Sequence, residues 1–290
     1  MMHQYLRTVG FSKYNHVREL RPILNRIIMD PETVSMVREG EEIFGYFSRS
    51  FGEDFGLRVF VTYEGGTTYK EDYFFPYAVT DVVSSRAMCT VEKRSDRMAF
   101  SGMCDESAFG ISLIFFVSNG MEYARKCQEG VPKISYVALT ALSISGKVLL
   151  PLGKTARQRE RAHAMALDRA HLIEAAKDGD EEAMESLAIA DMNTAEQLSE
   201  RITREDIYSL VDNTFMPYGM ESDKYSIIAE IVSVREFANT ATGETVYRMI
   251  IDCSGIRMGL VINSADLLGV PSPGCRFKGD VWLQGRVVFE

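Results

Sequence analysis

The fold is decided between Leu57 and Val79, by the runs Leu57-Arg-Val-Phe-Val-Thr-Tyr63 and Tyr69-Lys-Glu-Asp-Tyr-Phe-Phe-Pro-Tyr-Ala-Val79, with Gly65-Gly66 between them. Both runs are rich in β-branched and aromatic residues, and a glycine pair is typical of a turn between strands. They therefore predict two neighbouring antiparallel strands. Runs of the same kind predict further strands at 89–94, 98–104, 110–117 and 134–150, the last turning back at Ser145-Gly146.

The residues before these strands predict a helix at 18–29, because Leu20, Leu24 and Ile27 recur at helical spacing. Strands that follow one another with short links favour a largely antiparallel sheet, and the helix is expected to pack on it. The fold class is therefore α+β, and residues 1–152 are predicted to form its β-rich antiparallel domain.

The pattern changes after Leu152, where hydroxyl residues followed three positions later by an acid or an amide indicate helix starts. They predict a helical segment over 153–222, with helices at 156–177, 181–190, 195–201 and 204–213. Residues 154–169 hold five basic and two acidic side chains, whereas 170–222 hold three basic and thirteen acidic ones. We expect a partner attracted by charge to bind this polarised segment.

Residues 223–290 return to strands, predicted at 227–237, 244–253 and 256–262 and followed by a short helix and a final run at 276–289. Three meandering strands, a small helix and one or two more strands are the order of an OB-type barrel. We therefore predict a small OB-like β-barrel domain, whose closure stays open because the last run is short for two strands. Seven basic residues face eight acidic ones here, which disfavours nucleic acid as a partner.

The composition of the 290-residue chain, with a net charge of −9, indicates a soluble cytoplasmic protein. Its longest uncharged stretch, 107–121, is shorter than the roughly 20 apolar residues that span a bilayer, so no membrane association is expected. The five cysteines are scattered and include no Cys-x-x-Cys pair. We interpret them as small buried hydrophobes in a reducing compartment.

Aromatic residues provide the clearest candidate for a binding surface. They are dense in the second of the two opening runs, and Trp282 stands in the tail. Strand alternation cannot place Tyr73, Phe74 and Phe75 all inside, so part of this patch is expected to face a groove or a partner. The candidate ligand or partner surface therefore contains Tyr73, Phe75, Tyr77 and Trp282.

The first helix of the middle segment carries Glu160, His163, His171 and Glu174 on one face. The Glu-x-x-His spacing resembles carboxylate-bridged metal helices, but at about 1.5 Å per residue the two halves lie more than roughly 10 Å apart. A solvated or interface stripe fits better, which adds His163 and His171 to the candidate surface. No metal site is expected.

A second candidate is Leu152-Gly153-Lys154-Thr155, which precedes a predicted helix as a phosphate-binding loop would. Val148 stands where that loop requires its first glycine, and bulky residues fill the positions between, so a helix cap is the better interpretation. The chain contains no Gly-x-Ser-x-Gly and no His-Glu-x-x-His motif. No catalytic residue and no cofactor are therefore expected.

Three parts of the sequence are similar to a known family. They are Leu6-Arg-Thr-Val-Gly-Phe-Ser12, then Glu205-Asp-Ile-Tyr-Ser-Leu-Val-Asp212 with Met216-Pro-Tyr-Gly-Met-Glu-Ser-Asp-Lys-Tyr225, and finally Phe277-Lys-Gly-Asp-Val-Trp-Leu-Gln-Gly285. With them the chain resembles a bacterial domain-of-unknown-function family, DUF3881. The resemblance spans both ends and so covers nearly the whole chain. It implies no activity, ligand or catalytic residue.

Three functions stay open at this point. The first is a non-enzymatic binding or scaffold protein of the bacterial cytoplasm that meets a protein, a small ligand or a second copy of itself. The second is an enzyme with a site between the front sheet and the helices, which would need a pocket that gathers polar side chains such as Glu71, Arg86, His163 or His171. The third is a protein that binds single-stranded nucleic acid through the C-terminal barrel.

Overall fold

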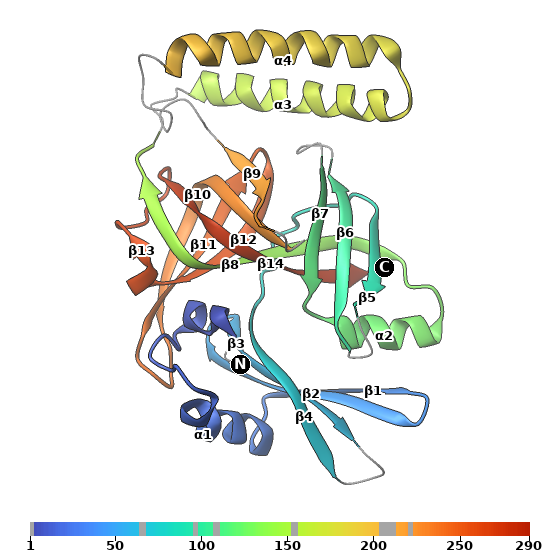
Figure 1. Cartoon of the computed structure of the whole chain (residues 1–290), viewed down its shortest axis with the longest axis vertical. Coiled ribbons are helices and arrows are strands. Elements are labelled where there is room, and N and C mark those ends of the chain that lie inside the picture. The colour runs from blue at the N-terminus through green and yellow to red at the C-terminus, as the bar shows by residue number, and fades with distance from the viewer. Residues whose placement is uncertain are drawn as a thin grey trace.

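The protein is a β-rich α+β structure, as predicted, with two sheets and a separate pair of long helices (Figure 1). This computed structural model describes residues 3–63, 68–94, 98–106, 111–151, 156–202, 213–219 and 223–290.

The first sheet is antiparallel and has the strand order β1-β2-β3-β4. It is preceded by two short helical elements. The elements of this part are η1 (Gln4–Val9), α1 (Val17–Met29), β1 (Thr33–Glu39), β2 (Glu42–Gly52), β3 (Phe55–Tyr63) and β4 (Tyr69–Ala78).

Helix α1 confirms the helix predicted at 18–29. It begins with a capping box, in which Glu19 bonds back to the amide of His16. Leu20, Leu24 and Ile27 are fully buried, and the helix packs on β2 and β3. One face of the first sheet is therefore covered by α1, as the apolar stripe of the helix predicts.

The second sheet is larger and mixed, and it takes strands from both halves of the chain. Its order is β13-β8-β12-β11-β10-β14-β7-β6-β5, and β9 pairs with β10. Its elements are β5 (Cys89–Lys93), β6 (Phe100–Glu106), β7 (Ile111–Val117), α2 (Gly120–Glu129), β8 (Ile134–Leu149), β9 (Thr214–Pro217), β10 (Lys224–Ala238), β11 (Thr245–Cys253), β12 (Ile256–Asn263), η2 (Ser264–Asp266), β13 (Leu267–Leu268) and β14 (Arg276–Phe289).

The prediction of a single antiparallel front sheet is therefore correct for β1 to β4 and wrong for the strands that follow. β7 pairs in parallel with β14, and β8 pairs in parallel with β12 and antiparallel with β14. Strands β8, β12, β11, β10 and β14 are thereby joined in a closed ring of pairings.

The predicted turn at Ser145-Gly146 is also wrong, because β8 runs through both residues. Gly146 is paired with Gly279 of β14. A side chain at Gly146 would lie 2.4 Å from the ring of Phe277, so the glycine makes room for that ring instead of forming a turn.

Helices α3 (Ala156–Lys177) and α4 (Glu181–Ile202) form a hairpin that stands apart from the sheets (Figure 1). The predicted break at Asn193 is wrong, because α4 is continuous. Asparagine and threonine disfavour a helix interior by less than about 1 kcal/mol each, which packing against α3 can offset. The helix predicted at 204–213 lies almost entirely outside the described residues. Within the described part of the chain, no helix has the length and apolar character needed to cross a membrane.

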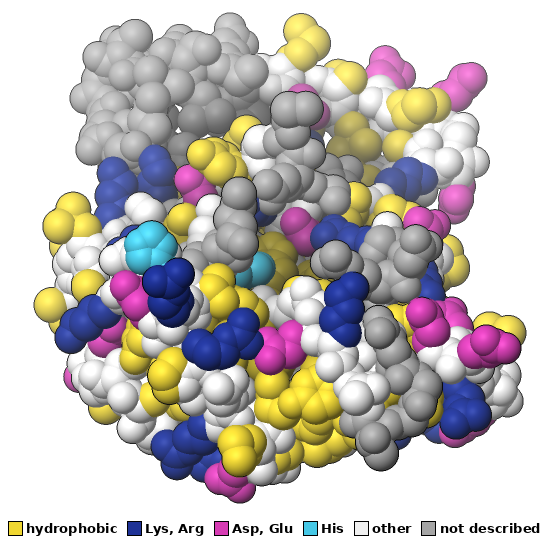
Figure 2. Space-filling model, turned by 60° about the horizontal axis from the view of Figure 1, so that its bottom comes forward, with side chains coloured by type: hydrophobic (Ala, Val, Ile, Leu, Met, Phe, Trp, Pro, Cys, Tyr) yellow, Lys and Arg dark blue, Asp and Glu magenta, His cyan; other side chains and the backbone are white. Residues whose placement is uncertain are grey.

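On the face of the molecule drawn in Figure 2, basic and acidic side chains are interspersed. The described residues on this face therefore form no large patch of one charge. The described sheets also have ion pairs between elements, for example Arg21 with Glu71 and Lys93 with Glu39. The strong charge asymmetry counted in the sequence lies in the middle segment, residues 153–222.

Candidate functional site

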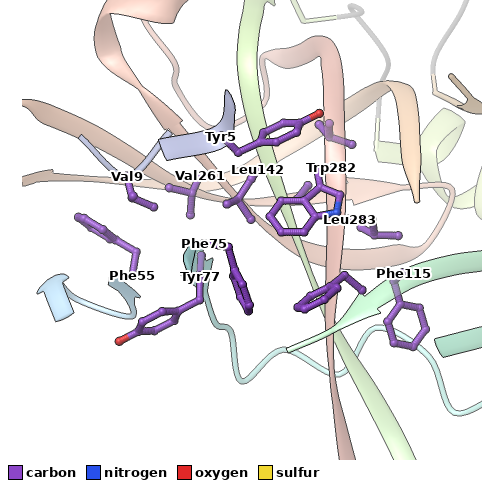
Figure 3. Packing of buried hydrophobic residues seen from close by; sticks show 14 of the residues in the cluster. Tyr5, Val9, Phe55, Phe75, Tyr77, Phe115, Leu142, Val261, Trp282 and Leu283 are labelled. Atoms are coloured by element: carbon purple, nitrogen blue, oxygen red, sulfur yellow. The ribbon is translucent and has the colours of Figure 1, made fainter. Parts of the chain in front are cut away.

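The predicted aromatic surface is placed between the two sheets. Tyr73, Phe75 and Tyr77 lie on one face of β4, and Trp282 lies on β14. The rings of Phe75 and Trp282 point toward each other, with centroids 6.2 Å apart (Figure 3). Phe75, Tyr77 and Trp282 are 3%, 8% and 6% exposed, so each packs in the core. A binding role for them stays a prediction.

The prediction that part of the aromatic patch is exposed assumed that only one face of β4 is buried. That assumption is wrong. Tyr73 and Phe74 are both half-buried against the hydrophobic core, although they point to opposite faces of β4. Helix α1 packs on the first sheet, and the ring of Phe75 meets Trp282 of the larger sheet, so neither Tyr73 nor Phe74 is fully exposed.

The predicted histidines lie far along the chain from this cluster, on α3. His171 is exposed. The side chain of His163 is outside the described part of the structure. Glu71 pairs with Arg21, and Arg86 lies over the ring of Tyr136, so the polar residues named for an enzyme site meet different partners.

A buried carboxylate next to Trp282 forms a polar cluster that the sequence did not predict. Asp223 is 5% exposed and precedes β10. Its Oδ2 accepts a hydrogen bond from the indole nitrogen of Trp282 (3.1 Å) and pairs with Arg94 at 3.0 Å. Its carbonyl oxygen accepts from the amide of Leu283 (2.9 Å). Asp223 therefore joins the end of β5 to the start of β10 and to the middle of β14.

The ring of His3 completes this cluster, 5.0 Å from the ring of Trp282. Burial, together with the charge of Lys224, lowers the pKa of His3 to about 4, although the charge of Asp223 opposes the shift. Its Nδ1 is buried and has no hydrogen-bond partner among the described residues. Lys224 lies over the ring of Tyr5, 5.6 Å from its centroid. His3 is therefore neutral where an ordinary histidine would begin to charge.

The neutral state of His3 predicts a pH dependence of stability. Its folded pKa of about 4 is below the ordinary value of 6.5, so the unfolded chain binds the proton first as the pH falls. The stability that neutral His3 provides is complete above pH 6.5 and is lost between pH 6.5 and about 4, at up to about 1.4 kcal/mol per pH unit. We expect His3→Asn to flatten this part of the profile, measured by urea unfolding. His171→Asn, at an exposed site, is the control, and equal profiles for wild type and His3→Asn would contradict the prediction.

The chemistry available to the Asp223 cluster follows from its contacts. The carboxylate is committed to a guanidinium and an indole N–H, and charge-assisted bonds of this kind are among the strong ones in proteins. A buried pair of this kind is costly to break, because the remaining charge is left without compensation. The cluster therefore holds four segments of the chain together: the end of β5, the start of β10, the middle of β14 and His3 at the start of η1.

A buried cation, Arg58, lies near Tyr77. The guanidinium of Arg58 lies 4.4 Å from the ring centroid of Tyr77 and 5.0 Å from that of Tyr46, and it donates to the carbonyl of Ser118. Its Nε has no hydrogen-bond partner among the described residues. Burial raises the pKa of Tyr77, so its ring stays neutral beneath the cation.

The surface also has a depression of about 570 Å³, which is within the size range of small-ligand sites. Three of its polar side chains already have partners: Arg49 pairs with Asp30 (2.8 Å), Glu32 accepts from the amide of Ser50 (2.8 Å) and Glu53 pairs with Arg235 (2.6 Å). Exposed pairs of this kind each contribute about 1 kcal/mol or less. The described residues contain no group of three or more side chains suited to hold a metal ion.

The sequence contained an indication of the Asp223 cluster, but the sequence alone did not show that these residues meet. The strings that carry the family resemblance include Asp223 and Trp282, and the fold pairs Lys224 with Trp282 across β10 and β14. The first string, Leu6–Ser12, begins in η1, whose Tyr5 contacts the ring of Trp282. Three separate parts of the sequence thus meet at one place.

Comparison with known proteins shows where this chain belongs. No curated protein and no solved structure matches it. One family model matches residues 6–285, nearly the whole chain, and its description is "Domain of unknown function, E. rectale Gene description (DUF3881)". The chain belongs to the DUF3881 family.

Proposed function

We propose that this protein is a non-enzymatic binding or scaffold protein of the bacterial cytoplasm, and that its hairpin α3–α4 docks a protein partner with a basic surface. The supporting observation is the surface of the hairpin. Among the side chains of the hairpin that the structure describes, the exposed acidic ones are Asp168, Glu174, Asp178, Asp180, Glu181, Glu182, Glu185 and Asp191. Exposed apolar side chains lie among them, and these are Met165, Met184, Ile189 and Met192.

Two helices alone cannot bury all of their apolar surface, and exposed apolar residues beside polar ones are typical of protein interaction sites. Methionine suits such a site because its side chain adapts to different shapes. The negative charge selects a basic partner and repels nucleic acid. The hairpin therefore combines apolar contact with electrostatic choice of partner.

The experiment is a pull-down from native lysate at low and raised salt, with the full chain as bait. We expect the triple variant Glu181→Lys, Glu182→Lys and Glu185→Lys to lose about tenfold or more of the bound partner, because like charges then oppose each other. Binding by the wild type should also weaken as the salt concentration rises.

The matched control is a triple variant on the β-sheets, Glu41→Lys, Glu42→Lys and Glu92→Lys, which changes the net charge equally at exposed positions. It should keep the partner. Equal retention by both triple variants, or recovery of only a second copy of this chain, would contradict docking of a basic partner on the hairpin.

We further infer that strands β8, β10, β11, β12 and β14 form an OB-like barrel. The closed ring of five pairings supports this, together with η2 between β12 and the last strand. The fifth strand is then β8, which precedes the helical hairpin in the sequence. The proposed barrel therefore takes strands from both sides of the domain boundaries predicted at 152 and 222.

A further inference from the structure

Two cysteines face each other across β5 and β6. Cys89 is the register partner of Cys104. The amide of Arg94 donates to the carbonyl of Ala99 (2.8 Å), which makes those two residues a hydrogen-bonded pair of the same ladder. Because the two kinds of pair alternate, Cys89 and Cys104 form a non-hydrogen-bonded pair, whose Cα atoms lie about 4.5 Å apart. A disulfide spans about 4.4–6.8 Å between Cα atoms, so this position can hold one.

The two thiols differ in access. Both are free, and β5 is the edge strand of the larger sheet. Cys89 is half-buried on that edge, whereas Cys104 is 1% exposed. A small reagent can therefore reach Cys89 first, while Cys104 is protected behind it.

The two thiols also differ in acidity. The hydrogen bond between them lowers the pKa of Cys89 and, together with burial, raises the pKa of Cys104. The charges of Asp105 and Glu106 raise the pKa of Cys104 as well. Cys89 is therefore the thiol that ionises, and the thiolate is the form that attacks a disulfide.

We propose that Cys89 and Cys104 form a reversible redox pair, which small-molecule disulfides oxidise to an intramolecular disulfide. In the first step the Cys89 thiolate attacks one sulfur of the small disulfide. The bond between the two sulfurs of the reagent breaks, one thiolate leaves and takes up the proton that Cys89 released, and a mixed disulfide remains on Cys89.

The second step follows from the first because the mixed disulfide removes the negative charge that kept Cys104 protonated. Cys104 loses its proton and attacks the sulfur of Cys89, and the second thiol of the reagent leaves with that proton. Two electrons pass from the protein to the small disulfide, which is reduced to two thiols. An excess of a dithiol reverses the reaction.

The position of the pair indicates what the bond changes. It would join the edge strand β5 covalently to β6, below the hairpin end at which Arg94 reaches Asp223. Oxidation would therefore fasten the strand whose far end supplies the ion pair of the buried cluster. This inference is independent of the hairpin α3–α4 and of its partner.

The test exposes the native full chain to oxidised glutathione, then unfolds it and alkylates the remaining thiols. We expect two of the five cysteines to escape alkylation, and dithiothreitol to restore both. Cleavage after lysine and arginine leaves Cys89, Cys104 and Cys127 on three separate peptides, so mass spectrometry identifies the linked pair. A link to Cys127, which is exposed on α2, would overturn the proposal, as would five alkylated cysteines.

Single variants assign the two roles. Cys104→Ser should hold glutathione on Cys89 as a stable mixed disulfide, whereas Cys89→Ser should leave Cys104 unmodified. Cys253→Ser is the control, because burial raises the pKa of Cys253 to about 12 and its loss should not change the linked pair. Glutathione retained on Cys89 of the wild type would show that Cys104 does not resolve it and would refute the pair.

Discussion

Replacing Trp282 with alanine should lower the free energy of unfolding by about 3–5 kcal/mol, the largest effect we expect from a single substitution. The indole contacts the ring of Tyr5 at 5.3 Å, of Phe75 at 6.2 Å and of Phe116 at 5.5 Å between centroids. These rings belong to η1, to the first sheet and to the second sheet, respectively, and Figure 3 shows Tyr5 and Phe75 beside Trp282. Alanine would leave a cavity where all three meet and would deprive Asp223 of the indole N–H. Denaturant unfolding measures the loss.

Trp282→Phe shows how much of this loss a single aromatic ring can prevent. Phenylalanine keeps one buried ring in place of the two fused rings of the indole and removes the donor to Asp223, which still pairs with Arg94. We expect this variant to lose about 1–3 kcal/mol, less than the alanine variant. A loss below about 1 kcal/mol for Trp282→Ala would mean that the two sheets do not depend on the indole for their packing.

Replacing Gly56 with alanine should destabilise the first sheet by about 3 kcal/mol, the upper part of the usual range for an overpacked site. A side chain there would lie 2.1 Å from the carbonyl oxygen of Arg49, which is backbone and cannot rotate away. The register of β2 and β3 shifts between Ser50 and Gly52, opposite this position. A bulge of this kind brings one backbone close to the other strand, and glycine accommodates it. The midpoint of denaturant unfolding measures the effect.

Gly45→Ala is the matched control, because Gly45 lies on β2 of the same sheet. A side chain at Gly45 would make ordinary contacts, the nearest at 3.4 Å. We expect this variant to stay within about 1 kcal/mol of wild type. If both variants unfold at the same denaturant concentration, the bulge yields to a methyl group and the argument for Gly56 fails.

Elements with a strong local pattern could be predicted from the sequence. Helix α1 was expected at 18–29 and spans Val17–Met29, because its buried stripe recurs at helical spacing. The meander of β10, β11 and β12 was expected at 227–237, 244–253 and 256–262, and residues with positive φ, Gly243, Ser254 and Gly255, lie in the turns between its strands. These elements depend on neighbours a few residues away, which a linear pattern contains.

The candidate site could be predicted only in part. The sequence singled out Trp282 as an aromatic residue, but it did not show that the side chain is buried against Asp223 and His3. Asp223 stands between a serine and a lysine, which is ordinary surroundings for a solvated carboxylate. Its burial depends on Arg94, which lies more than a hundred positions earlier in the chain.

The sequence by itself determined the types of most elements, the β-rich α+β class and the acidic middle segment, because periodicity and charge are local properties. Only the tertiary structure decided that β8 pairs with both β12 and β14, and that the end of β4, from Phe75 to Ala78, is buried on both faces. It also decided that Asp223 is buried beside Trp282. Each of these facts joins residues far apart in the sequence, and such contacts depend on how whole surfaces fit, which no local pattern records.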